Sequence, residues 1–591
     1  MSKHSPLLTA LSIAAIGFTF PLVAAEPALG RLVPSDVALV AALNDVPALR
    51  RTFPETATGR AWSDPEIARF FAPLRAQPDI AEFIAKVKAE TGYTPEELLE
   101  FVSGDVLLTV PSTSIALADG KPAMEVLLAI EVGDNESKLR RLIEEQNTRR
   151  AGTPEAFVTE DYNGALLYLQ AATESSESQD DDMVWALHEG RWFIATDRAL
   201  VTGALDALAA GGLATSLTSS TEYQEVLNRA GGDADLVLLL NWKVIYPAVI
   251  AAFEAARDPN TPPNMFGVEP VNIMKALGLD ALESISLTSS SSGSTERLDS
   301  AFRFTEPRGL LALMAYRDGP VARPDWVPSS WFNVTSQNAA LSDAYAELER
   351  MLDLISPMMA GMAQGQLKAF ERQIGVELKR DLIGNMGTAI LSGYADPVGS
   401  ETEASTPYDE LDQFVAISLA DAAGFERAVE AIKTHFLPPG DASPLQKRDY
   451  LDRTLHTFTP SGGDTGFTYA IADGWLLIGT GTAGSVESAL QLMHTPNPAN
   501  SFWQRADVRD ALVDVPVGAF SVQYAELAPL MASLAASAVK FQATQDEKKG
   551  RFVDPDAVPS RDKLGQFFKP MISYGTRDAN GFYIHAESSA R

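Results

Sequence analysis

The sequence predicts an α+β protein of two tandem, internally duplicated domains, each a largely antiparallel sheet with helices packed on one face. Three observations support this. Strand-like runs alternate with helix-like runs, tight-turn signals join many of the strands, and one ordered series of segments occurs twice. Tight hairpins produce antiparallel neighbours, and helices between strands pack onto the sheet. At 591 residues the chain also exceeds what one hydrophobic core usually supports.

The first sign of duplication is Val-Pro-Ser, which occurs at residues 33–35 and again at 327–329. Downstream of each copy, two glycines lie 12 residues apart, and a strand-like run follows the second one. They are Gly92 and Gly104 in the first copy, and Gly375 and Gly387 in the second. This period is far longer than the roughly 20–50 residues of solenoid repeats, so we expect two globular domains. The alternative is two unrelated α+β domains that share turn chemistry.

Each copy also contains a hairpin whose turn favours a positive φ. The turn residues are Glu189-Gly190 in the first copy and Asp473-Gly474 in the second. Such pairs suit the tight turns between antiparallel strands. A helix is predicted after each hairpin, over 199–209 and 485–493.

Each copy then continues with a strand, a helix that contains a proline, and a closing pair of strands. The prolines are Pro247 and Pro529, and proline is tolerated in the first turn of a helix. The closing strands are expected at 282–288 and 297–304, and at 571–575 and 581–588. We interpret the serine-rich tip at 289–294 as a solvated turn rather than as a source of a nucleophile.

Two long helical stretches are predicted, each interrupted by proline. Residues 66–91 contain Pro73 and Pro78, and residues 339–373 contain Pro357. The second stretch is rich in methionine, which predicts core packing, with an adaptable binding groove as the alternative.

The N-terminus predicts a signal peptide over residues 1–25. Residues 7–23 are nearly all apolar or small, and Val23-Ala24-Ala25 before Glu26 resembles a cleavage site. An uncleaved membrane anchor is the alternative. The first α+β repeat domain is expected over 26–316, a linker over 317–327 and the second repeat domain over 328–591. An acidic loop is expected at 174–182.

Composition excludes several classes of function. The formal net charge of −31 argues against nucleic acid, because binding it requires clustered Lys and Arg. The chain has no cysteine, which excludes disulfides, thiolate catalysis and thiolate zinc sites. An exported chain without disulfides suggests a bacterial envelope protein, either periplasmic or extracellular. No membrane span is expected after the signal is cleaved.

No motif predicts a catalytic, cofactor-binding or metal-binding residue, and we expect no cofactor. Gly479–Gly484 matches a dinucleotide-binding glycine pattern, but its counterpart in the first copy has none of the glycines, and no acidic residue ends a strand about 20 residues later. The six histidines, including His188 and His585, lack metal-ligand spacing, and we interpret them as surface or half-buried residues. The acidic residues near 161–164 and 180–182 lack the spacing of a calcium loop.

The opening residues 32–40, followed by 45–49, resemble the start of large exported bacterial proteins known only as a domain of unknown function. The segment from Gly92 to Gly104 and the hairpin turns are similar to theirs as well. The resemblance matches no characterised family, and it implies export to the envelope and no established activity. The second copy departs from it at residues 331–334, Trp-Phe-Asn-Val.

We therefore expect an exported, non-catalytic binding or scaffolding protein of the bacterial envelope, with a protein, peptide or lipid partner of unknown identity. Sheet faces or an interdomain groove would hold that partner. One alternative is a hydrolase whose site is not visible in the sequence. It would be favoured by a pocket with convergent polar groups and a titratable residue of perturbed pKa. Another is a carrier of an apolar ligand, which requires a long apolar cavity under the sheet.

Overall fold

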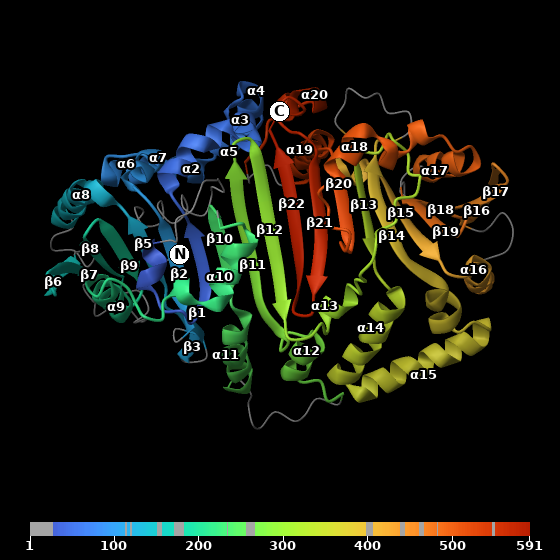
Figure 1. Ribbon diagram of the computed structural model, residues 1–591, viewed down its shortest axis with the longest axis horizontal. Coiled ribbons are helices and arrows are strands. Elements are labelled where there is room, and N and C mark those ends of the chain that lie inside the picture. Colours follow the sequence, from blue (N-terminus) through green and yellow to red (C-terminus); the bar gives the residue numbers. More distant parts are fainter. Residues whose placement is uncertain are drawn as a thin grey trace.

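The computed structural model describes residues 28–590, except 113–114, 119–120, 150–156, 171–182, 233, 256–265, 398–405, 438–443, 460–465, 481–482 and 546–549. The predicted signal peptide and acidic loop lie outside the described residues. The described chain is a mixture of helices and strands built around one large antiparallel sheet of 20 strands (Figure 1). A separate hairpin contains β3 (Ile115–Ala118) and β4 (Lys121–Met124).

Ten strands of the sheet come from the first half of the chain and ten from the second. The first ten are β1 (Val37–Leu43), β2 (Val106–Pro111), β5 (Leu127–Glu131), β6 (Phe157–Tyr162), β7 (Ala165–Gln170), β8 (Val184–His188), β9 (Arg191–Ala195), β10 (Leu236–Leu240), β11 (Leu282–Ser292) and β12 (Thr295–Phe304). The second ten are β13 (Asn333–Asn338), β14 (Met386–Ala395), β15 (Asp412–Leu419), β16 (Leu445–Tyr450), β17 (Arg453–Phe458), β18 (Phe467–Ala472), β19 (Trp475–Thr480), β20 (Ser521–Ala525), β21 (Met571–Asp578) and β22 (Gly581–Ser589).

The order of the strands in space is the same in the two halves. In the first half it runs β6-β7-β8-β9-β5-β2-β1-β10-β11-β12. In the second half it runs β16-β17-β18-β19-β15-β14-β13-β20-β21-β22. The halves meet where β12 pairs with β22, so the second series follows the first in reverse. The duplication of domains itself stays a prediction.

The glycines that suggested a repeat perform matching tasks in the two halves. Glu189 and Gly190 have φ values of 48° and 73°, and Asp473 and Gly474 have 48° and 80°, as the predicted turns require. A Cβ on Gly104 would lie 2.1 Å from the Glu131 carboxylate, and one on Gly387 would lie 2.4 Å from the Ser418 hydroxyl. Both glycines therefore allow a close approach to the neighbouring strand.

Helices cover both faces of the sheet in its outer parts, whereas the sequence predicted one covered face. In the first half, α9 (Arg198–Ala209) and α10 (Thr221–Arg229) pack on one face. On the other face lie α2 (Val46–Thr52), α6 (Pro78–Thr91), α7 (Pro95–Leu98) and α8 (Glu136–Arg149). Alternate residues of β5 and β9 are buried in the two opposite cores, so both faces of these strands are apolar. In the second half, α17 (Gly484–His494) and α18 (Ala506–Ala511) face α16 (Ala422–Phe436) across the sheet.

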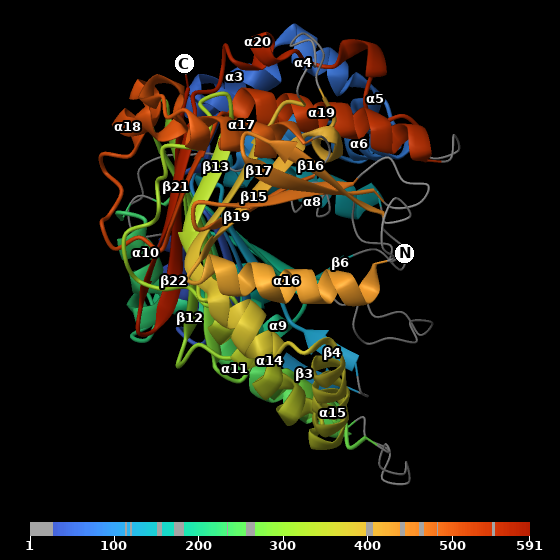
Figure 2. The same ribbon diagram turned by 90° about the vertical axis from the view of Figure 1, so that its right-hand side faces the viewer.

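The remaining helices form two groups, one above and one below the centre of the sheet in the view of Figure 1, and in each group helices of the two halves pack together (Figures 1 and 2). The upper group packs α3 (Ala57–Ser63), α4 (Pro65–Phe70) and α5 (Ala72–Arg75) near α19 (Leu527–Thr544) and α20 (Arg561–Leu564). The lower group contains α11 (Trp242–Ala255), α12 (Pro270–Ala276), α13 (Leu310–Leu313), α14 (Leu341–Ile355) and α15 (Pro357–Ile374). In the upper group Lys563 forms an ion pair with Asp64 at 2.6 Å. Helices of the first half therefore pack against helices of the second half in both groups.

The predicted long helices are broken at their prolines. Pro78 and Pro357 each begin a new helix, and Pro73 is the second residue of α5; in the first turn of a helix the missing N–H has no helical partner. Among the methionines, Met351 is buried, whereas Met358, Met359 and Met362 are exposed on α15. In the part of the chain that the structure describes, no helix combines the length and apolarity needed to cross a membrane.

Alanine substitutions at the two matching turns should have unequal costs. Gly474→Ala should cost about 1–2 kcal/mol, because an L-residue at φ near +80° is strained. Gly190→Ala should cost more, because its Cβ would also lie 3.1 Å from the Cα of Gly133, whereas nothing lies within 4 Å at Gly474. Urea unfolding midpoints measure both. Gly361→Ala, in the open interior of α15, is the control and should stabilise slightly. Equal losses at the two turns would contradict the role of Gly133.

Candidate functional site at the seam between the halves

The two halves join along a single strand pair, β12 with β22, which we call the seam. Its register runs from Thr295 opposite Ser589 to Arg303 opposite Gly581. Asp299 and His585 are each the fifth residue of their strand, and they face each other. Equivalent positions of the two halves therefore meet at the middle of the seam, one carrying a carboxylate and the other an imidazole.

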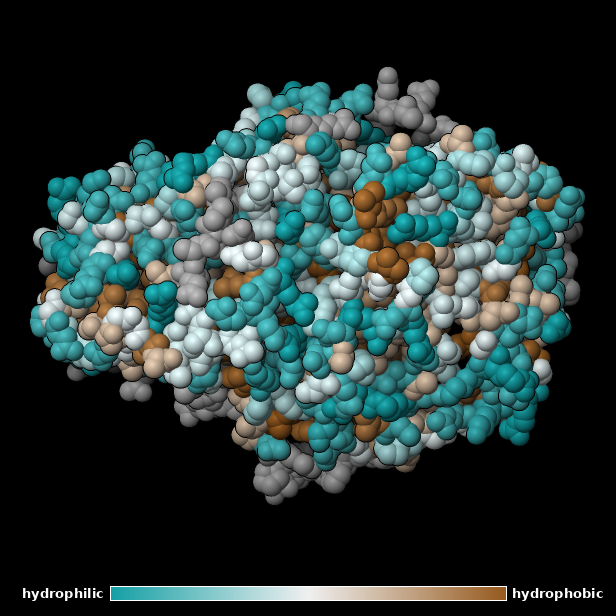
Figure 3. Space-filling model, in the orientation of Figure 1, coloured by the Kyte–Doolittle hydropathy of each residue, from teal (hydrophilic) through white to brown (hydrophobic). Residues whose placement is uncertain are grey.

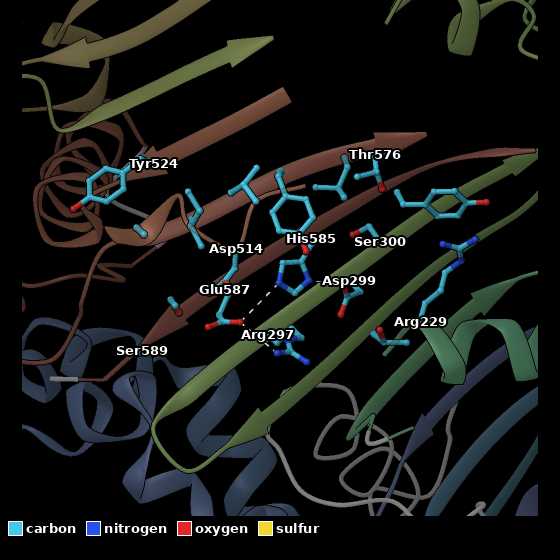
Figure 4. A pocket seen from close by; sticks show the side chains of 18 of the residues that line it. Arg229, Arg297, Asp299, Ser300, Asp514, Tyr524, Thr576, His585, Glu587 and Ser589 are labelled. Carbon is cyan, nitrogen blue, oxygen red and sulfur yellow. Dashed lines mark hydrogen bonds and ion pairs between the residues drawn. The ribbon is translucent and has the colours of Figure 1, made fainter. Parts of the chain in front are cut away.

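A cavity of about 940 Å³ lies over the seam, and we call it the seam groove. Its floor comes from β11, β12, β22 and β21, one wall from α10, and the other from α18 and the turn after it. It opens on the face toward the viewer in Figure 1, which Figure 3 shows to be mostly hydrophilic. Figure 4 gives a close view of its side chains. Both halves of the chain are needed to form it.

Strand register explains why polar groups gather on the floor. Thr288, Asp299, His585 and Tyr574 lie directly opposite one another on four successive strands. Residues that oppose each other in antiparallel strands project to the same face. This row therefore crosses the groove from β11 to β21.

His585 is held by groups from both halves. Its Nδ1 lies 2.7 Å from Asp299 Oδ1, and its ring packs against Tyr574 with 4.8 Å between centroids. Because a carboxylate oxygen can only accept, Nδ1 donates the proton and Nε2 is the acceptor of the neutral ring. Nε2 lies 3.8 Å from Glu587 Oε2, and the His585 side chain is 18% exposed. The free imidazole nitrogen thus faces the groove beside a carboxylate.

The other charges on the floor and on the α10 wall are positioned by partners. Arg297 lies opposite Glu587, and their side chains form an ion pair at 3.4 Å. The Arg229 guanidinium lies 3.4 Å from the centroid of the Tyr583 ring, a cation–π contact from α10 to β22. Arg229 Nη2 also forms an ion pair with Asp578 at 3.6 Å, a distance too long for a hydrogen bond.

The α18 wall is acidic. Asp507 accepts hydrogen bonds from Arg505 at 2.6 Å and from Tyr524 at 2.7 Å. The bond from Arg505 is the main cause that lowers the pKa of Asp507 to about 2, against the opposing effect of burial. Burial is the main cause that raises the pKa of Tyr524. Asp510 and Asp514 also line the groove and are exposed to solvent.

The residues that the sequence singled out do not assemble with this site, except for His585. Gly479 pairs within the sheet, and a Cβ there would lie 2.5 Å from Ser485 Oγ, so close packing against α17 accounts for this glycine. His188 ends β8, 4.0 Å from the Glu189 carboxylate. Residues 161–162 end β6 and 163–164 form the β6–β7 turn, whereas 180–182 lie outside the described residues. Within the described ranges no group of three His, Cys, Asp or Glu could hold a metal ion.

Sequence reasoning missed Asp299, Arg297, Glu587 and Arg229. Asp299 and His585 come from hairpins at opposite ends of the chain, and no local pattern indicates that β12 and β22 pair. The only available signal was the alternation of polar residues in both closing strands.

The tautomer of His585 should depend on Asp299. In the wild-type protein the neutral ring should carry its proton on Nδ1, because Asp299 accepts it. Asp299→Asn should shift the proton toward Nε2, since an amide can also donate. Nitrogen chemical shifts of the labelled ring measure this, with Asp514→Asn as a control that leaves the ring unchanged. A wild-type ring protonated on Nε2 would contradict the assigned geometry.

Asp507 should contribute to acid stability. Its pKa is lowered by folding, so its contribution is complete above the unfolded value of about 4 and is lost as the pH falls through about 2. Asp507→Asn should therefore lose less stability than the wild type between about pH 4 and pH 2. Melting temperatures across that range test this. Asp510→Asn should follow the wild-type profile, and a parallel profile for Asp507→Asn would refute the prediction.

Comparisons with known proteins identify no characterised family. No family model matches the chain, and no curated protein matches it. Two solved structures, crystal forms III and IV of TP0453, align with 48% and 49% of this chain and with 80% and 83% of theirs. They are 10% and 9% identical, with TM-scores of 0.24 and 0.23, too low to support an argument about fold or function.

Proposed function

We propose that the protein is an exported, non-catalytic binding protein of the bacterial envelope, periplasmic or extracellular, whose ligand occupies the seam groove. In this proposal two α+β repeat domains, related by duplication, fuse into one sheet. The finished groove then belongs to neither domain alone.

The observation that supports this most is the size and position of the groove. Its volume of about 940 Å³ lies near the top of the roughly 300–1,000 Å³ that small-molecule sites occupy. Arg229, Arg297 and Asp299 come from the first half, and Asp507, Tyr574 and His585 from the second. Ligand sites often form where domains meet.

The pairing of charges on the floor favours binding over catalysis. Asp299 is engaged with His585, and Glu587 with Arg297. Groups fixed in this way provide a preorganised polar surface that costs little to order when a ligand binds.

The hydrolase is the second candidate, and one observation favours it. The groove brings together polar groups and Asp507, whose pKa is perturbed, and His585 presents Nε2 for proton abstraction. A carrier of apolar ligands has less support: the apolar cavity against Trp192 has a volume of only about 10 Å³.

Blocking the groove should abolish ligand binding. Because the chain has no cysteine, Thr576→Cys introduces a single thiol into the groove, and N-ethylmaleimide can then block it. A library of polar fragments is screened by thermal shift and ligand-observed NMR. We expect fragments that bind the unmodified variant and are lost after alkylation.

Asp353→Cys, on the exposed surface of α14, is the matched control and should keep every fragment after alkylation. Failure to find any bound fragment, or binding that survives alkylation at residue 576, would refute the proposal. Turnover of a bound compound that His585→Gln abolishes without loss of binding would replace it with the hydrolase.

A further inference from the structure

The two helical walls of the seam groove carry charges of opposite sign, and Lys569, just before β21, adds a further cation to the lining. Asp510 lies on α18 and Asp514 in the turn after it, whereas Arg229 ends α10. Figure 4 shows Asp514 and Arg229 on opposite sides of His585. A ligand that crosses the groove therefore meets negative charge at one side and positive charge at the other.

These wall charges are available to a ligand, unlike those of the floor. In the described part of the chain, Asp510 and Asp514 have no ion pair, whereas their neighbour Asp507 is bonded to Arg505. Arg229 stacks on Tyr583, which fixes the plane of the guanidinium, and its ion pair with Asp578 at 3.6 Å is too long for a hydrogen bond, so its N–H groups can still donate to a ligand. A guanidinium held in this way can bind a carboxylate through two hydrogen bonds.

The middle of the groove suits an uncharged, hydrogen-bonding chain. Asp299 and Glu587 are already engaged with His585 and Arg297, so they do not require a charged partner. The hydroxyls of Thr576 and Tyr574 line the groove and can both donate and accept. Peptide groups have the same dual capacity.

We propose that the ligand is a short peptide with free ends, its amino terminus against Asp510 and Asp514 and its carboxylate on Arg229. This inference rests on the proposed function. A purely cationic ligand would be repelled by Arg229, and a purely anionic one would be repelled by the acidic wall and by the net charge of −31. A single amino acid would fill only part of about 940 Å³, whereas a peptide of several residues can span both walls.

Three forms of tetra-alanine test the charge requirement by isothermal titration calorimetry on the full chain. The first has both termini free, the second is N-acetylated, and the third is C-amidated. We expect the free peptide to bind and each blocked form to bind at least tenfold more weakly. Equal affinity for the three forms, or no binding of the free form, overturns the inference.

Substitutions should remove the preference for each end separately. Asp510→Asn combined with Asp514→Asn should bind the free and N-acetylated peptides equally, and Arg229→Gln should bind the free and C-amidated peptides equally. Asp353→Asn and Arg551→Gln, at exposed positions outside the groove, are the matched controls and should keep both preferences. Unchanged melting temperatures confirm that each variant folds. A preference that survives in the groove variants refutes the assigned orientation.

Binding measurements on Thr576→Cys before and after alkylation show whether this inference alone fails or the proposed function fails as well. If fragments bind the groove but tetra-alanine does not, the peptide assignment falls and the groove remains a binding site. If tetra-alanine binds equally well after alkylation, its site lies elsewhere, and the peptide assignment is refuted.

Discussion

The pairing of β12 with β22 is the constraint on which the rest of the structure depends. Nine residue pairs, from Thr295 opposite Ser589 to Arg303 opposite Gly581, join the two halves into one sheet. Without this pairing each half would expose the backbone N–H and C=O groups of a long edge strand, a liability that proteins usually avoid. The same register places Asp299 opposite His585, so the pairing that fuses the halves also forms the floor of the groove.

Packing on both sides of the seam holds that register in place. Phe304, Phe520 and Phe582 form an aromatic cluster, with Tyr316 stacked on Phe520 at 4.0 Å. The helices of the upper group add apolar packing between residues that are distant in sequence, such as Ile67 of α4 and Leu564 of α20. Slippage by one residue would move every side chain of the strand to the opposite face, so these contacts also fix which groups line the groove.

The site follows from the fold at two levels. Register alone aligns Thr288, Asp299, His585 and Tyr574 across four strands. The walls depend in addition on the joining of the halves. The helices α10 and α18 occupy matching places in the two halves, and they face each other across the groove only because β12 pairs with β22. The two helices contribute opposite charges, because α10 ends at Arg229 whereas α18 and the turn after it carry Asp510 and Asp514.

The sequence alone determined the turns, the helix breaks and the repeated series of segments, because these features depend on residues that are close together in the chain. Glycine at a positive φ and proline at a helix start act within a few residues, and Gly190, Gly474 and Pro357 lie where their chemistry requires. The tertiary structure alone decided that both faces of the sheet are covered and that β12 meets β22. His585 acquires a partner only because residues 286 positions apart become neighbours across the seam. Pairing between distant strands depends on the packing of the whole chain, and no short pattern encodes it.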